Sequence, residues 1–267
     1  MKTLIPTLSI ARPPYAPQWR TPLMALRQYS ILFRVALAEY RRSWFFHLIR
    51  SLLFPIAFLF LVKTARGAMN TEEAIFLLGG NLTTALAFGT ITMLALKIGW
   101  GRQSHEFDYW AALPVMKLAL LLALMSVGLF FALPGLIGTY FFGCAFLGLP
   151  WSSGLALLPL VPLGALSLAG LAAFLGSFAP NGQATTMMVN IVTVFIGFLS
   201  PMLVSLNVLP APLRILNLIV PLTYIADAFR GALGGHTELN VMIDVLILLT
   251  FAFVFLFLVH HKLDWRR

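Results

Sequence analysis

The side chains that could perform catalysis or bind a metal are scattered along this sequence. The five histidines are His47, His105, His236, His260 and His261. None stands at a metal-ligand spacing from a second acid or thiol, and His260 and His261 are adjacent, so they point to different sides of a helix. The single cysteine, Cys144, has no base near it in sequence, so we interpret it as a packing residue. We therefore predict no catalytic residue and no metal site in this chain.

The densest group of chemically distinctive residues is the stretch GRQSHEFDYWAALPVMK at 101–117, which combines acids with aromatic side chains. Ser104 is a possible helix cap, and Glu106 and Asp108 fall in or just past the first turn, where the positive end of the helix dipole favours carboxylates. A tight charged connector is the alternative interpretation, but it gives no reason for three aromatics: Phe107, Tyr109 and Trp110. Aromatics with a few charges are typical of protein interfaces, so we predict a short docking helix at about 103–114 that shows its acids and all three aromatics to the cytosol.

The rest of the chain is too apolar for a water-soluble fold. Of its 267 residues, 60% are hydrophobic and 10% are charged, whereas soluble domains carry about 25% charged residues. Six stretches are apolar and long enough for a helix to cross a bilayer, at about 48–63, 74–96, 118–142, 154–178, 185–207 and 241–259. The sequence thus predicts an all-α integral membrane protein with six transmembrane helices within 45–260.

The positions of Lys and Arg predict how these spans are oriented. Of the 18 Lys and Arg residues, four fall on one side of the predicted membrane: Lys63, Arg66, Arg214 and Arg230. The other fourteen share a side with the tails at 1–21 and 261–267, so we expect both termini to be cytoplasmic. Topology then accounts for most of the net charge of +9, and we predict no nucleic-acid partner.

The segment before the first span predicts an amphipathic helix at 22–44. Arg27, Arg34 and Arg41 recur every seven residues, which places them nearly on one helical face, and Pro22 suits a first helical turn. Apolar residues cover the remaining faces, and an ordinary cytosolic helix would expose too many of them to water. We predict that this helix lies in the cytoplasmic membrane interface, with its arginines among lipid headgroups.

Polar side chains inside the predicted spans are the candidates for a transport path. Asn81 and Thr84 lie in the second span, and Asn190 lies in the fifth. In hydrocarbon such groups either bond to neighbouring helices, which is the commoner case, or face a water-filled cavity. Both alternatives stay open at this stage.

The stretch at 209–240 is too long for a tight turn and too apolar for a free loop. Pro210 and Pro212 mark the start of a short helix, Pro221 breaks it, and Thr223 is a possible cap of a second helix. Each piece is too short to span a bilayer, so we predict a re-entrant helical hairpin at about 209–236.

Two charges of this second helix form a predicted pair. Asp227 and Arg230 stand three residues apart, close enough to neutralise each other on one helical face. The alternatives are a helical flap on the outer surface with a weak ion pair, and a partly dry setting in which each charge needs the other.

In these motifs the sequence resembles a membrane subunit of the type-2 ATP-binding-cassette exporters, from about Leu23 to the C-terminus. That family has an amphipathic cytoplasmic helix before six spans and an acidic-aromatic coupling helix ending in an LP turn, matched here by EFDYWAALPVMK. It also has a P-L-T-Y-x-x-D-A-x-R run before the last span, matched by PLTYIADAFRGAL at 221–233.

The resemblance assigns roles to several groups of residues. It implies that the docking helix couples to an ATPase through Glu106, Phe107, Asp108, Tyr109 and Trp110, and that the outer re-entrant region contains Pro221, Tyr224, Asp227 and Arg230. It further implies that spans one and five face a second permease. This adds three residues of the fifth span to the possible pathway lining: Met187, Phe195 and Phe198.

The implied function is a permease subunit of an ATP-driven exporter in the cell inner (plasma) membrane. The implied partners are two cytoplasmic ATPase subunits, a second copy of this permease or a related one, and membrane lipids. The chain has no G-x-x-x-x-G-K-[ST] loop, so we expect it to be no enzyme and to bind no cofactor, with ATP and Mg held by the partner. The substrate stays open between lipid-like, drug-like and glycan-type molecules.

Two other functions are weighed against this one. An ion-coupled secondary transporter predicts buried acids near mid-span, but all nine acids fall in loops or near span ends. An integral-membrane lipid-modifying enzyme requires a cluster of catalytic polar residues, and the sequence shows none.

Overall fold

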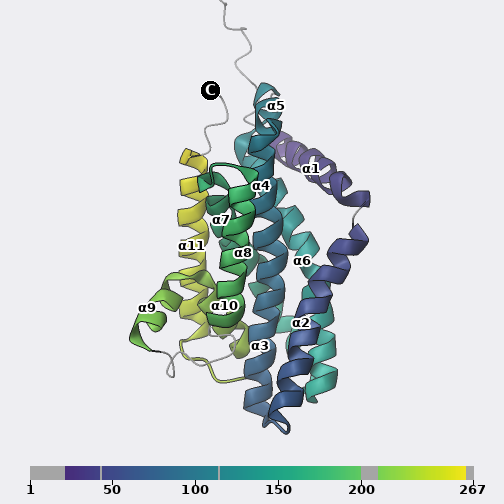
Figure 1. Ribbon diagram of the computed structural model, residues 1–267, viewed down its shortest axis with the longest axis vertical. Helices are drawn as coiled ribbons and strands as arrows, with labels where there is room; N and C mark the ends of the chain where they lie inside the picture. The colour runs from purple at the N-terminus through teal and green to yellow at the C-terminus, as the bar shows by residue number, and fades with distance from the viewer. Residues whose placement is uncertain (1–21, 43, 114, 200–209, 263–267) are drawn as a thin grey trace, which may run out of the picture.

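The computed structural model describes residues 22–42, 44–113, 115–199 and 210–262, and this part of the chain is helical without strands (Figure 1). The first half contains α1 (Pro22–Glu39), η1 (Tyr40–Arg42), α2 (Trp44–Arg66), α3 (Thr71–Ala87), η2 (Phe88–Thr92), α4 (Met93–Gln103) and α5 (Glu106–Ala112). The second half contains α6 (Lys117–Leu147), η3 (Trp151–Leu157), α7 (Leu160–Phe178), α8 (Gly182–Leu199), α9 (Ala211–Ile219), α10 (Pro221–Ala232) and α11 (Val241–Lys262).

Four helical stretches of the described residues are long and apolar enough to cross a membrane. They are Trp44–Arg66, Thr71–Gln103, Lys117–Leu147 and Gly154–Phe178. The last predicted span contributes a shorter apolar stretch, Val241–Phe255, and the fifth, 185–207, runs beyond the described end of α8. The all-helical, multi-pass class is therefore confirmed, while six crossings stay a sequence prediction.

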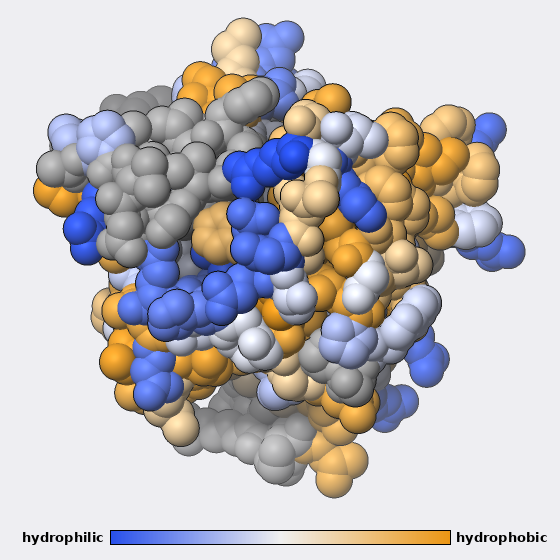
Figure 2. Space-filling view, turned by 90° about the horizontal axis from the view of Figure 1, so that it is seen from below, coloured by the Kyte–Doolittle hydropathy of each residue, from blue (hydrophilic) through white to orange (hydrophobic). Residues whose placement is uncertain are grey.

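The helices define two ends of the molecule. Helices α1 and α5 lie at one end, which we call the α5 end, and the turn between α2 and α3 lies at the other (Figure 1). Helices α9 and α10 lie toward this second end, which we call the α10 end, and Figure 2 views the molecule from there. Hydrophilic residues gather across that face, and apolar residues surround them.

The second predicted span forms the centre of the bundle. The apolar part of this span is 83% buried, whereas the apolar part of α2 is only 18% buried. Helix α2 lies at the periphery of the bundle and exposes most of its surface. Glycines allow close packing around this central span: a Cβ at Gly89 would come within 2.5 Å of Ala132 on α6. The exposed apolar side of α2 faces the surroundings of the subunit. Such a surface is stable when the helix is embedded in a membrane.

The central span is not a regular α-helix along its whole length. Residues Phe88–Thr92 form the π-helical segment η2 between α3 and α4. Such segments are rare, and they frequently occur at functional sites. No pattern in the sequence predicted this change in helical pitch.

Helix α1 packs on α6 through one face and leaves another apolar face exposed. Leu32 and Ala36 are buried, and the Tyr29 hydroxyl donates a 2.8 Å hydrogen bond to Ser126 Oγ. Leu23, Leu26, Ile31 and Val35 are exposed together with Arg27 and Arg34. The predicted bounds of 22–44 were too long: α1 ends at Glu39, and Arg41 falls in η1, where the chain turns into α2.

Candidate functional site

The docking helix predicted at 103–114 is α5, and it begins after a left-handed residue. His105 has φ 59° and ψ 20°, and its Nδ1 lies 2.8 Å from Asp108 Oδ2. The prediction that Ser104 caps this helix was wrong: Ser104 terminates α4, and its hydroxyl lies 3.4 Å from the carbonyl of Gly101. The chain reverses tightly between α4 and α5, so position 104 belongs to the preceding helix.

Lys97 of α4 connects α5 to α1. Its ammonium lies 2.8 Å from Glu106 Oε1 and 2.6 Å from Glu39 Oε2, although Glu39 is 58 residues away in sequence. Burial raises the pKa of the neighbouring Tyr40, while the positive charge of Lys97 acts in the opposite direction. One cation thus holds carboxylates from two other helices, and a displacement of α5 acts on both α1 and α4.

The aromatic residues of α5 divide between its two faces. The prediction that all of them face outward was wrong: Phe107 is 8% exposed and packs beside Gly101, and Trp110 is half-buried. The Trp110 indole donates to Glu106 Oε1 at 3.2 Å. Tyr109 is 63% exposed, and Asp108 is exposed as well. The buried face anchors α5 to the bundle, and the exposed face is available to a partner.

The end of α4 is also connected to α7 and α8. Arg102 donates to the carbonyls of Ser177 and Ala179 at 2.5 and 3.2 Å, where the last turn of α7 leaves acceptors without helical partners. Gly182 N donates to Gln103 Oε1 at 2.8 Å. Polar bonds therefore link α5 to α4, and α4 to the start of α8.

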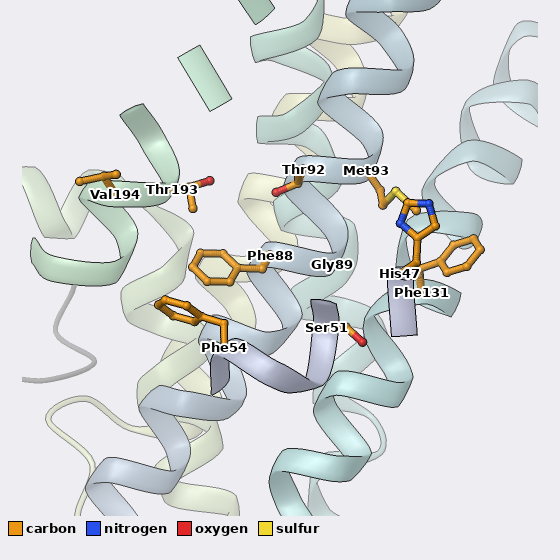
Figure 3. A pocket seen from close by; sticks show the side chains of 10 residues that line it. All are labelled: His47, Ser51, Phe54, Phe88, Gly89, Thr92, Met93, Phe131, Thr193 and Val194. Atoms are coloured by element: carbon orange, nitrogen blue, oxygen red, sulfur yellow. The ribbon is translucent and has the colours of Figure 1, made fainter. Parts of the chain in front are cut away.

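A cavity of about 330 Å³ lies between α2, the π-helical segment, α6 and α8. In Figure 3 the rings of Phe54 and Phe88 lie next to each other, with centroids 4.8 Å apart, while His47 lies near Phe131. The lining is mainly apolar, with a few polar groups: His47, Ser51, Thr92 and Thr193. Its size falls at the lower end of the range for small-molecule pockets, about 300–1,000 Å³.

Asn81, Thr84, Met187 and Asn190, which were predicted to line a pathway, are not among the residues that line this cavity. Asn81 and Thr84 are buried inside the bundle, where Asn81 Nδ2 donates to the carbonyl of Pro55 at 2.9 Å and Thr84 bonds within its own helix. The bond of Asn81 joins α3 to α2, which favours helix–helix bonding for this residue, whereas this bond of Thr84 stays within α3. Met187 and Asn190 are exposed on α8, and the side chains of Phe195 and Phe198 lie outside the described residues. The cavity-lining residues of α2 and η2 carried no recognisable sequence signal.

The segment before the last span is a helix–break–helix, as predicted from its prolines. Pro210 precedes α9, Pro221 is the first residue of α10, and Gly234 follows the end of α10 with φ 84°. Thr223 does not cap α10, because Val220 does; the Thr223 hydroxyl instead donates to the carbonyl of Asn217 at 2.6 Å. This bond and the one from Tyr224 Oη to Leu218 O, at 2.8 Å, hold the angle between the two helices.

The two charges of α10 are buried, and each contacts groups outside α10. Asp227 is 4% exposed and accepts the backbone N–H groups of Glu238 and Leu239 at 2.9 and 2.8 Å. Arg230 is 3% exposed, and its guanidinium carbon lies 3.4 Å from the centre of the Phe76 ring. The hypothesis of an exposed flap is therefore wrong for α10. A description of Asp227 and Arg230 as a simple ion pair omits the backbone amides and the aromatic ring that contact them.

These features define a class of protein: a multi-pass helical membrane protein with an anchored helix presenting a polar and aromatic face at one end. Residues 27–233 match the family model of the ABC-2 type transporter, and because this match covers most of the chain, the protein belongs to that family. A search of curated proteins returned no match. The chain is thus a permease component of an ABC transporter, and such membrane domains generally work with cytoplasmic ABC ATPase subunits.

Proposed function

We propose that this chain is the membrane-spanning subunit of an ATP-driven exporter located in the cell inner membrane. It moves its substrate out of the cytoplasm or the inner leaflet, and a separate pair of ATPase subunits supplies the energy. In this proposal the α5 end faces the cytoplasm, where the exposed side of α5 meets the ATPase. The family membership and the anchored helix α5 support this assignment.

The observation that carries the proposal is the connection of α5 to the bundle through Lys97. Lys97 holds Glu106 of α5 and Glu39 of α1, so movement of the docked helix is passed to two further helices. The bonds of Arg102 and Gln103 extend the same connection toward α7 and α8. Motion driven by nucleotide binding would therefore reach α8, which borders the cavity.

We propose that the substrate is an amphipathic, lipid-like or drug-like molecule whose apolar part enters the cavity. The lining is mainly apolar and includes the rings of Phe54, Phe88 and Phe131, which suits an apolar group, while a sugar would require polar partners for its many hydroxyls. A glycan-type substrate is the competing outcome. The exposed apolar sides of α2 and α8 are the surfaces that we expect a second permease to cover.

The test uses the permease reconstituted in liposomes with the ATPase subunits that co-purify with it. Reversing both acids of α5, Glu106→Arg with Asp108→Arg, is expected to reduce substrate-dependent ATP hydrolysis and transport at least tenfold. Membrane insertion should persist, because these residues lie outside the apolar stretches. Glu72→Arg, an exposed acid near the α10 end, is the matched control. Wild-type transport by the double variant would overturn the proposal.

A second arm of this test addresses the substrate class. Thr193→Trp on α8 would fill part of the cavity, and we expect it to abolish transport of amphipathic dyes while nucleotide hydrolysis in the absence of substrate continues. Unchanged dye transport would remove the cavity from the pathway. Stimulation of the ATPase by oligosaccharides, and by no amphipathic compound, would favour the glycan-type alternative.

A further inference from the structure

The cavity beneath α2 is polar at one level and aromatic at another. His47 of α2 lies beside Phe131 of α6, with ring centroids 5.3 Å apart. Phe54 follows His47 by about two helical turns on the same face, and its ring packs on Phe88 with centroids 4.8 Å apart. Helix α2 thus presents a histidine to the cavity near the α5 end and a phenylalanine farther from it.

The central span runs antiparallel to α2 and repeats this division. Helix α2 leads through a turn into α3, so Phe88 lies farther from the α5 end than Thr92, which follows it by about one helical turn. Thr92 lines the cavity and is 5% exposed. Figure 3 shows Thr92, Thr193 and His47 above the rings of the two phenylalanines. The polar level therefore lies toward the α5 end, and the aromatic level lies toward the α10 end.

The polar level coincides with the membrane interface that the aromatic residues of α2 indicate. Trp44, the first residue of α2, is 55% exposed, and Phe46, next to His47, is 72% exposed. Exposed Trp side chains are typical of the boundary between lipid head groups and hydrocarbon. A molecule that enters from the leaflet at the α5 end would bring its head group to the polar level and its chain to the phenylalanine rings.

The polar level can donate hydrogen bonds, and none of the ten residues that line this cavity is an acid. A histidine ring carries at least one N–H in either protonation state, and the hydroxyls of Thr92 and Thr193 are also donors. The Ser51 hydroxyl donates within α2, to Leu48 O at 2.9 Å. A cationic head group would be buried here without a carboxylate to balance it, whereas an acidic head group would accept from these donors.

The charges close to the polar level also favour an anion. Tyr40 of η1 packs edge-on against His47, with ring centroids 5.4 Å apart, and it is followed by two exposed cations, Arg41 and Arg42. The acid before Tyr40, Glu39, is already bonded to an ammonium group 2.6 Å away. The two arginines and Glu39 together carry a net positive charge, which attracts an anion.

On the basis of the proposed function, which assigns the cavity to the transport path, we propose that it binds an amphiphile with an acidic head group, a phosphate or a carboxylate. The head group lies at His47 and Thr92, and the chain lies against the rings of Phe54 and Phe88. The substrate then enters the cavity in the orientation that it has in the leaflet at the α5 end. His47 is the residue that determines specificity for the head group.

Photolabelling of the full chain in nanodiscs of zwitterionic lipid can map this orientation. The first probe is dodecyl phosphate with a diazirine at the end of its alkyl chain, and the second carries the diazirine next to the phosphate. Mass spectrometry should find the first label near Phe54 and Phe88 and the second near His47 and Thr92. The reverse pattern, or labelling that excess dodecyl phosphate does not suppress, would overturn the proposal.

Competition between head groups tests the substrate class. Dodecyl phosphate and dodecanoate should suppress the labelling at concentrations at least about tenfold lower than dodecyltrimethylammonium, a ratio that one charge-assisted hydrogen bond can supply. Equal or stronger competition by the ammonium compound, held on the faces of the rings, would refute the acidic head group. The proposed export function would survive that result, because these measurements use the permease without ATPase or transport.

Substitutions test the assignment to His47. His47→Phe keeps an aromatic ring without nitrogens, so the preference for acidic head groups should disappear while the chain-end label stays near Phe54. His47→Gln retains an N–H donor and should keep part of the preference, and His236→Gln, at an exposed histidine of the α10 end, is the control. Thr193→Asp places a carboxylate in the cavity and should reverse the preference. A wild-type preference in His47→Phe would show that another group selects the head.

Discussion

The α5 end and the α10 end both contain charged clusters, but the two clusters are built differently. At the α5 end, Lys97 bonds two carboxylates that remain 31% and 52% exposed. At the α10 end, Asp227 and Arg230 are almost fully buried and are held by backbone amides and an aromatic ring. Hydrated ion pairs form and break at little cost, whereas buried charges require all of their partners. The first arrangement suits transmission between helices, and the second suits a fixed structure.

The largest effect is expected from Asp227→Asn. The amide can accept only one of the two backbone N–H groups and directs its own N–H at the other, so we expect a loss of about 2–3 kcal/mol in the free energy of unfolding. We expect the proposed export to fall as well, because α10 loses its bonds to the backbone of residues 238 and 239. Thermal unfolding in detergent checks the first expectation, with the exposed acid Glu72→Gln as control.

The charge-swapped variant tests whether Asp227 is stabilised mainly by the charge of Arg230 or mainly by the backbone N–H groups that it accepts. If Asp227 and Arg230 mainly neutralised each other, Asp227→Arg with Arg230→Asp would recover stability. Because Asp227 is held by the N–H groups of Glu238 and Leu239, an arginine in its place would face two donors, and we expect no recovery. Recovery of half the loss or more would show that the amide bonds are secondary.

A smaller effect is expected from Lys97→Met at the α5 end. Glu39 and Glu106 would lose their shared partner but stay accessible to water, so we expect a loss of about 1–2 kcal/mol in the free energy of unfolding. Transport per ATP hydrolysed should fall more than stability does. Arg66→Met, an exposed cation at the far end of α2, serves as control. Equal losses of coupling in both variants would remove the special role of Lys97.

Labelling can show whether the two ends lie in different compartments. In a Cys144→Ser background, single cysteines at Ser104 and His236 should react with an impermeant thiol reagent from opposite sides of the membrane. His236 is exposed, whereas a side chain at the adjacent Gly235 would come within 2.5 Å of Ile75. Labelling of both positions from the same side would refute the orientation with α5 in the cytoplasm.

The smallest effect concerns helix capping at the two ends. Ser104→Ala should change stability by less than about 0.5 kcal/mol, because the hydroxyl does not cap α5. Asn70→Ala should cost about 1 kcal/mol, since Asn70 and Glu73 form a reciprocal capping box at the start of α3. Chemical denaturation of the two variants side by side measures the difference, and similar losses would contradict these assignments.

Sequence patterns were sufficient to predict the class of the protein, the short helix α5 and the break between α9 and α10. These features depend on composition and on local chemistry: apolar length predicts helices that cross a membrane, and proline and glycine fix the ends of the helices around residues 210, 221 and 234. The same patterns also placed Asp227 and Arg230 together on one helix. Capping by Ser104 and Thr223 was predicted wrongly, because the helices begin at other positions. His105 precedes α5, and Val220 precedes α10.

The tertiary structure alone decided which side chains meet. Lys97 and Glu39 are 58 residues apart and Arg230 and Phe76 are 154 apart, and a pattern in one sequence does not reveal such contacts. The π-helical segment and the cavity beside it depend on how α6 and α8 pack against the central span. Asp244 looked like an acid near a helix end, and only the packing of α10 on α11 makes it a buried one, because burial is a property of neighbours.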